Sequence, residues 1–312
     1  MGMRVTFLGT SSAKPSPLRN VSGLFLSPFE RKERWLFDCG DGTQLRILSA
    51  GLPLEHIRAI FISHMHGDHI FGLPGLLASM SLSNMPTEVE LYGPAPLADF
   101  LESVRSYSAA RRPSPFRFRA LAEGAVAAID GVAVECRLLD HRDPTYGFRI
   151  TEPDAPGKLD VSALERDGVP EGSVRGRLKR GEDVTLEDGR VLRGRDYLGP
   201  ARQGRVLAIV PDTSPCEASR ALAKDADLLV HEATLDDAQS GTALERKHST
   251  PSMAAETARG AGARRLALTH ISPRYHDKPE DLAAMLAAAQ AVFPETSLAE
   301  DLQSIDVPAR TD

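Results

Sequence analysis

Short runs of apolar residues recur along the chain, separated by polar and glycine-containing segments. In the first third they predict strands at Val5–Leu8, Trp35–Phe37, Ala59–Ile62 and Val89–Tyr92, because apolar runs of this length between turn residues are typical of buried strands. Leu97–Tyr107 instead has the apolar spacing of a helix. This part of the chain therefore combines short strands with helices.

The second half repeats the alternation of strands and helices. Three apolar runs predict further strands, at Val206–Val210, Leu228–Val230 and Leu266–Thr269. Pro251 is a good first residue for a helix, and Gly260 and Gly262 are its stop signals. Pro279–Val292 has the pattern of a final amphipathic helix. The whole pattern predicts an α/β protein.

One polar cluster interrupts this pattern directly after a predicted strand. His64, His66, Asp68 and His69 form the sequence H-x-H-x-D-H. His64 and His66 are expected on one face, because side chains on an extended chain alternate with a period of two. Gly67 allows a sharp turn, so that Asp68 and His69 approach from another direction. Three imidazoles and a carboxylate at this spacing favour a zinc site over a solvated polar turn.

Four residues from one loop cannot complete two metal sites, so the motif predicts further ligands downstream. Three residues of ligand type each follow a probable strand, namely His141, Asp212 and His270. Strand ends are where α/β proteins gather their chemistry. Together with the first cluster, these residues supply seven candidate ligands.

Composition says more about domain organisation and cellular location than about function. The 312 residues are enough for a large core, and we expect a single domain over 1–312. The net charge of −6 does not indicate nucleic-acid binding by the whole surface. Three widely spaced cysteines predict neither disulfides nor a cysteine metal site. No leader and no apolar run of about 20 residues is present, so we expect a cytoplasmic protein without a membrane span.

Residues 152–204 differ from the rest in being rich in glycine, proline and charge. Arg175, Arg177, Lys179 and Arg180 cluster within this segment. On composition alone, it is either a solvated surface insertion or a basic binding element.

Several segments together resemble one family. The sequence is similar to the ribonuclease Z group of tRNA 3′-processing endonucleases in the metallo-β-lactamase superfamily. The similarity is carried by the H-x-H-x-D-H motif and by Val5–Thr10, Arg19–Ser22, Trp35–Gln44, Val230–Thr234, His248–Thr250 and Leu268–Tyr275.

The resemblance implies a metallo-β-lactamase fold, a four-layer αβ/βα sandwich, in which residues 152–204 are a flexible arm that grips tRNA away from the scissile bond. It also implies two Zn²⁺ ions per subunit, although such ligands accept Mn²⁺ or Co²⁺ as well. The first ion would be held by His64, His66 and His141. The second would be held by Asp68, His69 and His270, with Asp212 bridging the two.

The implied activity is removal of the 3′ trailer from precursor tRNA, leaving a 3′-hydroxyl, by a homodimer. Asp68 is then the candidate general base, and His248, oriented by Glu232, is the candidate proton donor. A structural His248 is the alternative. Two other functions stay open at this point: a dinuclear hydrolase of a small phosphodiester or sulfate ester, and a non-catalytic RNA-binding protein.

The loop Pro15–Asn20 resembles the family's P-x-K-x-R-N element, which lies near the RNA 3′ end and helps to refuse tRNAs ending in CCA. Here Pro17 occupies the lysine position, so a flexible cation is replaced by a residue with no donor. Arg19 and Asn20 are retained, and contact with the terminal nucleotides through them stays open. Rejection of CCA-bearing precursors should therefore be weakened.

Overall fold

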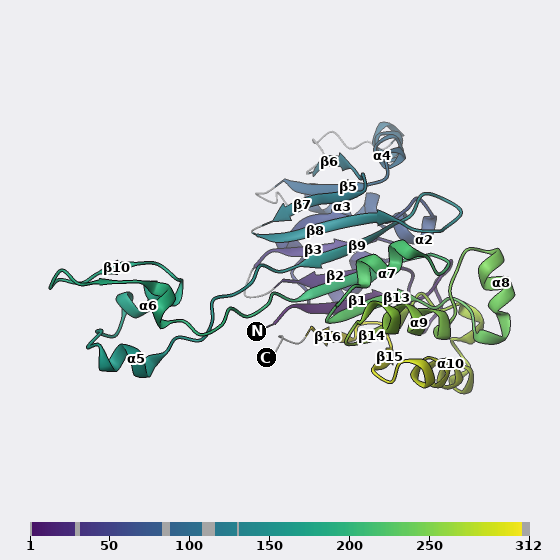
Figure 1. Ribbon diagram of the computed structural model, residues 1–312. Helices are drawn as coiled ribbons and strands as arrows, with labels where there is room; N and C mark the ends of the chain where they lie inside the picture. The colour runs from purple at the N-terminus through teal and green to yellow at the C-terminus, as the bar shows by residue number, and fades with distance from the viewer. Residues whose placement is uncertain (1, 29–31, 83–87, 108–115, 130, 308–312) are drawn as a thin grey trace. The chain divides into compact units, whose positions relative to one another are not determined.

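The computed structural model describes residues 2–28, 32–82, 88–107, 116–129 and 131–307. Its strands form two seven-stranded sheets and one two-stranded ribbon (Figure 1). The first sheet, in the order β16-β1-β2-β3-β4-β5-β6, comprises β1 (Arg4–Gly9), β2 (Gly23–Ser27), β3 (Arg34–Phe37), β4 (Ile57–Phe61), β5 (Val89–Gly93), β6 (Phe116–Ala120) and β16 (Ser304–Asp306). The second, in the order β15-β14-β13-β12-β9-β8-β7, comprises β7 (Gly124–Ile129), β8 (Val132–Leu138), β9 (Tyr146–Thr151), β12 (Val206–Val210), β13 (Leu228–Glu232), β14 (Leu266–Thr269) and β15 (Thr296–Leu298).

Helices of the same compact unit lie outside both sheets. They are α1 (Thr43–Ser49), α2 (Gly67–Ile70), α3 (Leu73–Leu82), α4 (Pro96–Tyr107), α7 (Glu217–Ala223), α8 (Ser240–Glu245), α9 (Pro251–Ala261) and α10 (Pro279–Val292), with 3₁₀ turns at Leu54–His56, Asp237–Gln239 and Pro273–Tyr275. Helices α1, α3 and α4 pack on the first sheet, and α7, α9 and α10 pack on the second. This is the four-layer αβ/βα sandwich that the resemblance implied.

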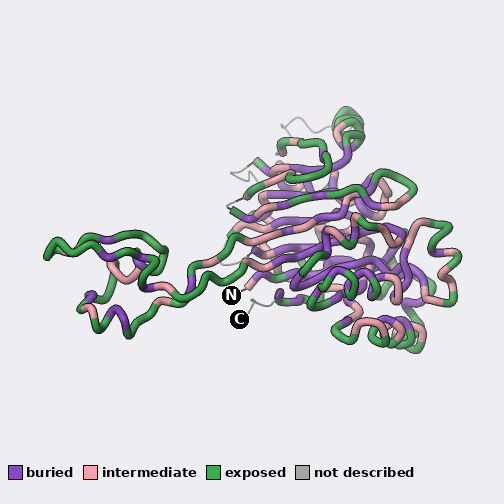
Figure 2. Tube along the Cα trace, in the orientation of Figure 1, coloured by how far each residue is buried: buried purple, intermediate pink, exposed green. Residues whose placement is uncertain are grey.

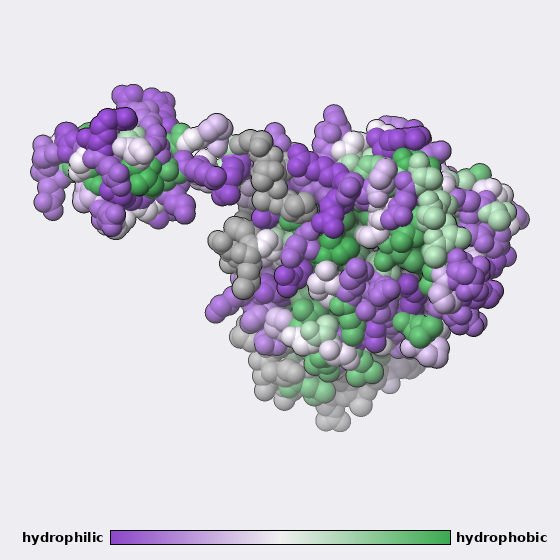
Figure 3. Space-filling view, turned by 90° about the horizontal axis from the view of Figure 1, so that it is seen from below, coloured by the Kyte–Doolittle hydropathy of each residue, from purple (hydrophilic) through white to green (hydrophobic). Residues whose placement is uncertain are grey.

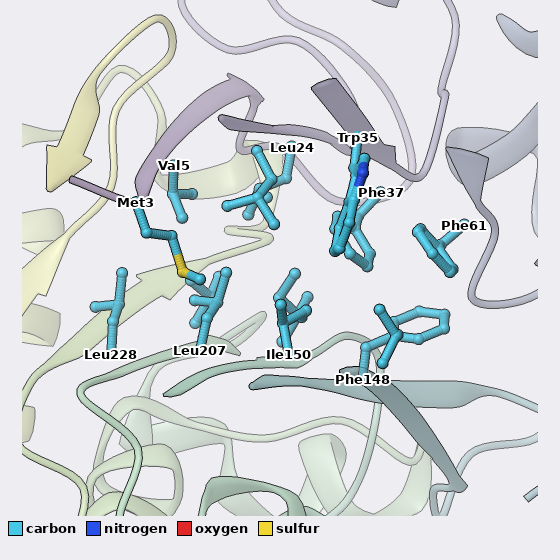
Figure 4. Close-up of a cluster of buried hydrophobic side chains, with 14 of the residues drawn as sticks. Met3, Val5, Leu24, Trp35, Phe37, Phe61, Phe148, Ile150, Leu207 and Leu228 are labelled. Atoms are coloured by element: carbon cyan, nitrogen blue, oxygen red, sulfur yellow. The ribbon is translucent and has the colours of Figure 1, made fainter. Parts of the chain in front are cut away.

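The main core lies between the two sheets. Figure 4 shows Val5, Leu24 and Phe37 of the first sheet facing Ile150 and Leu207 of the second. An aromatic group closes one end of this core, and its members are Phe37, Phe61, Tyr92 and Phe148. Burial of these apolar faces is the main stabilising contribution to such a sandwich.

The predicted strands are all present, with boundaries shifted by at most two residues, and so are the predicted helices. The limits of α9 follow the sequence signals. Thr250 caps its start by accepting a hydrogen bond from the Met253 amide, and Pro251 is its first residue. Gly262 ends it in a left-handed conformation at φ 69°, which glycine adopts without steric cost. No helix in the described part of the chain is long and apolar enough to cross a membrane.

Both sheets contain a block of parallel strands. In the first sheet β3, β4, β5 and β6 run parallel, and in the second β12, β13, β14 and β15 do. Parallel strands end at the same edge of their sheet, so the loops after them lie together. The loops after β4, β12 and β14 carry six of the seven predicted ligands.

Residues 151–205 form a second compact unit, which we call the arm. It contains α5 (Val161–Arg166), α6 (Ser173–Lys179), β10 (Val184–Thr185), β11 (Val191–Leu192) and a 3₁₀ turn at Gly194–Tyr197. Seven buried side chains give it a small core of its own, visible as short buried stretches in Figure 2: Ala163, Leu164, Val169, Leu178, Val184, Leu192 and Tyr197. Glu152 and Arg205 are joined by a backbone hydrogen bond of 2.9 Å and by an ion pair of 3.2 Å.

The basic residues of the arm are largely neutralised within it. Figure 3 shows mainly hydrophilic residues on its surface. Acidic residues are as numerous as basic ones between 151 and 205. Glu182 accepts hydrogen bonds from Arg177 at 3.0 Å and Arg180 at 2.7 Å, and Arg175 donates to the Val169 carbonyl. The arginine cluster seen in the sequence is therefore not a simple patch of free positive charge.

Candidate metal centre

The structure brings all seven predicted ligands together. His64 and His66 follow β4, Asp68 and His69 lie in the single turn of α2, and Asp212 and His270 follow β12 and β14. One group of neighbouring ligand atoms comes from His64, His66, His141 and Asp212, and a second comes from Asp68, His69 and His270. These are the two sets that the resemblance implied.

Asp212 faces both groups. Its Oδ2 lies 3.7 Å from His64 Nε2 and 4.0 Å from His141 Nε2. Its Oδ1 lies 3.2 Å from His270 Nε2 and 3.5 Å from His69 Nε2. A carboxylate with one oxygen toward each group is suited to bridge two ions.

Surrounding groups fix which nitrogen of each imidazole is free. The Lys247 carbonyl accepts a hydrogen bond from His141 Nδ1 at 2.8 Å, and the Asp38 carboxylate accepts one from His69 Nδ1 at 2.7 Å. Such acceptors require a proton on Nδ1, so the lone pair of each ring lies on Nε2. His66 is oriented the other way, because its Nε2 donates to Asp143 at 2.8 Å and leaves Nδ1 free.

Two hydroxyl groups orient the remaining rings by the same logic. Ser63 Oγ donates to Asp38 and lies 2.9 Å from His64 Nδ1. Thr234 Oγ1 donates to Glu232 and lies 3.0 Å from His270 Nδ1. A hydroxyl has one proton, so each can only accept from its histidine. His64 and His270 therefore also present Nε2 lone pairs to the centre.

These residues fit a metal because their acceptors converge without donors between them. His64 Nε2 lies 3.0 Å from His66 Nδ1, and His69 Nε2 lies 3.3 Å from His270 Nε2. Buried His141 Nε2 and Asp212 Oδ1 have no hydrogen-bond partner among the described residues. Unpaired buried acceptors cost about 1–3 kcal/mol each, and a divalent cation satisfies all of them at once.

Asp68 is held as an anion. Burial favours its neutral form, but the adjacent His270 and His69 rings and the Ala13 amide keep the pKa of Asp68 well below its usual value. Its Oδ2 also accepts from the Ala13 amide at 2.6 Å. A carboxylate that stays ionised is suited to hold a cation.

Glu232 and His248 form a buried pair beside the centre. Glu232 Oε1 lies 2.9 Å from His248 Nδ1. Burial opposes both charges, but each partner favours the other's charged form, so the pKa of Glu232 is lowered and that of His248 is raised. Glu232 is fully buried and both of its carboxylate oxygens accept backbone amides, an arrangement suited to orienting His248.

A cavity of about 740 Å³ opens over the centre, which we call the central cavity. Asp68, His248 and His270 contribute to its wall. Three cationic side chains line it as well, those of Lys14, Arg246 and Arg274. The ligand atoms that His248, Asp212 and His270 offer, one from each residue, lie within 4.8 Å of one another. The position of His248 therefore permits either a ligand role or a proton-donor role.

Sequence reasoning missed several residues that support the centre. Asp143 and Thr234 hold His66 and His270, and the Lys247 carbonyl holds His141. Thr234 lies in the segment that carried the family resemblance, which was a usable signal. A backbone carbonyl such as that of Lys247 has no signature in the sequence. The buried His231 contacts the Glu232 carbonyl and lies outside both groups.

The two residues retained in the loop after β1 differ in burial. Arg19 is buried, and its guanidinium donates to Thr10 Oγ1 and to the Ala299 carbonyl, both at 2.6 Å. The Arg19 side chain is therefore engaged inside the protein. Asn20 is only partly buried, and its side chain donates from Nδ2 to the Asp41 carbonyl while its backbone amide donates to Asp301.

The comparisons with known proteins agree with this geometry. A metallo-β-lactamase fold protein from Bacillus subtilis superposes with a TM-score of 0.68 at 19% identity, covering 98% of this chain and 100% of the other. The layers and the histidine–aspartate centre thus define a protein of the metallo-β-lactamase fold. A family model described as anti-Pycsar protein Apyc1 matches residues 3–154.

Closer relatives identify the family. Ribonuclease Z of Nostoc sp. is 45% identical over 99% of this chain and 96% of its own length. The crystal structure of human tRNase Z, short form, superposes with a TM-score of 0.67 at 33% identity, covering 98% of this chain and 100% of the other. The chain belongs to the ribonuclease Z family.

Proposed function

We propose that this protein is a dinuclear zinc endoribonuclease that removes the 3′ trailer from precursor tRNA and leaves a 3′-hydroxyl. The observation that carries the proposal is the convergence of five imidazoles, whose free nitrogens are set by their partners, on a bridging Asp212. The near full-length similarity to ribonuclease Z supports the substrate.

The three cations that line the central cavity suit RNA, which brings several phosphates, better than a small phosphodiester or sulfate ester with a single anionic group. Lys14, Arg246 and Arg274 bring positive charge to the wall of a site in a chain of net charge −6. Phosphates respond to local Lys and Arg residues more than to distant net charge. We include the arm in the proposal as the element that grips the tRNA body, through the cations that its own acidic residues leave unpaired.

The protein's own groups account for orientation and proton transfer. When bound, two divalent ions supply an activated water and polarise the phosphodiester. His248 carries the proton that the leaving 3′-oxygen needs when the P–O3′ bond breaks, and Glu232 keeps its ring protonated on Nδ1. Asp68 and Asp212 hold negative charge where the ions would lie.

The proposal includes a cytoplasmic homodimer. All three cysteines are free, as expected in a reducing compartment. Leu45 and Leu48 of α1 and Phe71 after α2 are exposed apolar side chains that association of two copies would cover. Sedimentation of the purified protein would measure its mass in solution.

Cleavage of one precursor tRNA transcript tests the activity. We expect the wild type to cut after the discriminator base and Asp68→Ala to lose nearly all cleavage while still binding the transcript, because affinity lies mostly in phosphate contacts elsewhere. The matched control is Asp99→Ala, which removes an exposed aspartate of α4 and should cleave normally. Failure of the wild type to cut, with metal bound, would reject the proposal in favour of a small-ester hydrolase.

A further inference from the structure

The loop between β1 and β2 places one lysine in the wall of the central cavity. Lys14 lines this cavity together with Asp68, His248 and Arg246. The side chain is exposed and makes no ion pair within the described part of the chain. Lys14 is therefore a cation beside the metal centre with no acidic partner in the described part of the chain.

The backbone under Lys14 is fixed on several sides. Its carbonyl accepts from Ser11 Oγ and its amide donates to the Ser12 carbonyl, both at 2.6 Å. The preceding Ala13 adopts a left-handed conformation at φ 59° and donates its amide to Asp68 Oδ2. A non-glycine residue is strained in this region, and the contact with a metal ligand offsets that cost.

Other residues of the loop cannot take the place of Lys14. Arg19 is buried and engaged by Thr10 and Ala299. Pro17 has no donor and does not line the central cavity. Lys14 is thus the cation that this loop makes available to a ligand in the cavity.

We infer that Lys14 binds a non-scissile phosphate of the RNA, next to the bond that is cut. This inference rests on the proposed function. An ammonium on a flexible stem can follow a phosphate that lies beside the metal centre, whereas the inner wall of aspartates and histidines is reserved for the ions. Lys14 then determines preference for a polynucleotide over a small diester, because a small diester has no second phosphate to reach it.

The experiment compares Lys14→Ala, Lys14→Arg and wild type on precursor tRNA and on bis(p-nitrophenyl) phosphate over a range of salt concentrations. For Lys14→Ala we expect kcat/KM on precursor tRNA to fall roughly tenfold, mainly through KM, and by much less on the small diester. The salt dependence of log kcat/KM should decrease in slope by about one, as for the loss of one phosphate contact. Lys14→Arg should restore most of the efficiency and the slope.

Two further measurements separate this role from a structural one. Lys224→Ala is the matched control, because Lys224 is an exposed lysine that does not line the cavity, and it should leave both efficiency and slope unchanged. Metal content and melting temperature of Lys14→Ala should match the wild type. An equal loss on both substrates, or an unchanged salt slope, would overturn the inference even if the wild type processes precursor tRNA.

Discussion

The buried carboxylate of Glu232 accepts hydrogen bonds from three separate segments of the chain. Its Oε1 receives the amides of Thr213 and Ser249, each at 3.0 Å, in addition to His248. Its Oε2 receives the amide and hydroxyl of Thr234. Hydrogen bonds to a charged group are about twice as strong as neutral ones, so this residue fixes the loops around the centre as well as one imidazole.

A His248 variant tests whether this residue is a proton donor or a metal ligand. We expect His248→Ala to keep its metal and slow cleavage of precursor tRNA by about 10²–10⁴-fold, the usual loss for a general acid. Atomic absorption and single-turnover rates measure the two quantities. His56→Ala, outside the central cavity, is the control. Loss of metal from His248→Ala would make His248 a ligand instead.

At the scale of elements, the loops after the parallel strands explain what sequence could and could not predict. The ligands His64, His66, Asp68 and His69 were predictable because one short motif contains them. Two groups that orient ligands were not predictable, because Asp143, which holds His66, and Lys247, which holds His141, come from other loops and meet these rings only in the folded chain. Neighbours in space that are distant in sequence leave no local pattern.

The loop before His248 shows the same limit. Lys247 adopts a left-handed conformation at φ 61°, and this turn directs its carbonyl to His141. Its ammonium pairs with Asp140 at 2.9 Å, next to that ligand. The sequence does not predict this left-handed turn, since lysine is not favoured at positive φ.

We expect the catalytic unit to keep its fold when the arm is deleted. Glu152 and Arg205 are hydrogen-bonded neighbours, so a short Gly/Ser linker can replace 153–203. We expect the shortened protein to hydrolyse bis(p-nitrophenyl) phosphate but to lose most activity on precursor tRNA, because binding energy remote from the reaction positions the substrate. Steady-state kinetics on both substrates measure this. Unchanged tRNA processing would leave the arm without a role in binding.

At the scale of the molecule, the centre joins the two sheets. His64 and His69 belong to the first sheet's loops, whereas His141, Asp212 and His270 belong to the second's. The alternation of strands and helices predicted both halves of the sandwich. The H-x-H-x-D-H motif predicted the ligands that follow β4 of the first sheet. The short strands β15 and β16 were not predictable, since a run of three residues carries too little pattern.

Removal of the metal should therefore destabilise the whole protein. An ion that binds only the folded state adds about 2.7 kcal/mol at a hundredfold excess over its Kd, which corresponds to roughly 4 °C in Tm for a chain of this size. Calorimetry with and without a chelator measures the difference. Asp212→Ala, which lacks the bridging carboxylate, should show a much smaller change on chelation. Equal shifts in both proteins would indicate that the chelator acts elsewhere.

The spacing of these ligands along the chain also has a consequence for biosynthesis. His69 is translated about two hundred residues before His270, and Asp212 comes late as well. A growing polypeptide that has reached only the first cluster holds the histidines of one sheet and no bridging carboxylate. Each set of ligands is complete only after most of the chain has left the ribosome. Metal acquisition is thus tied to the finished chain, so truncated products of translation would not become active nucleases.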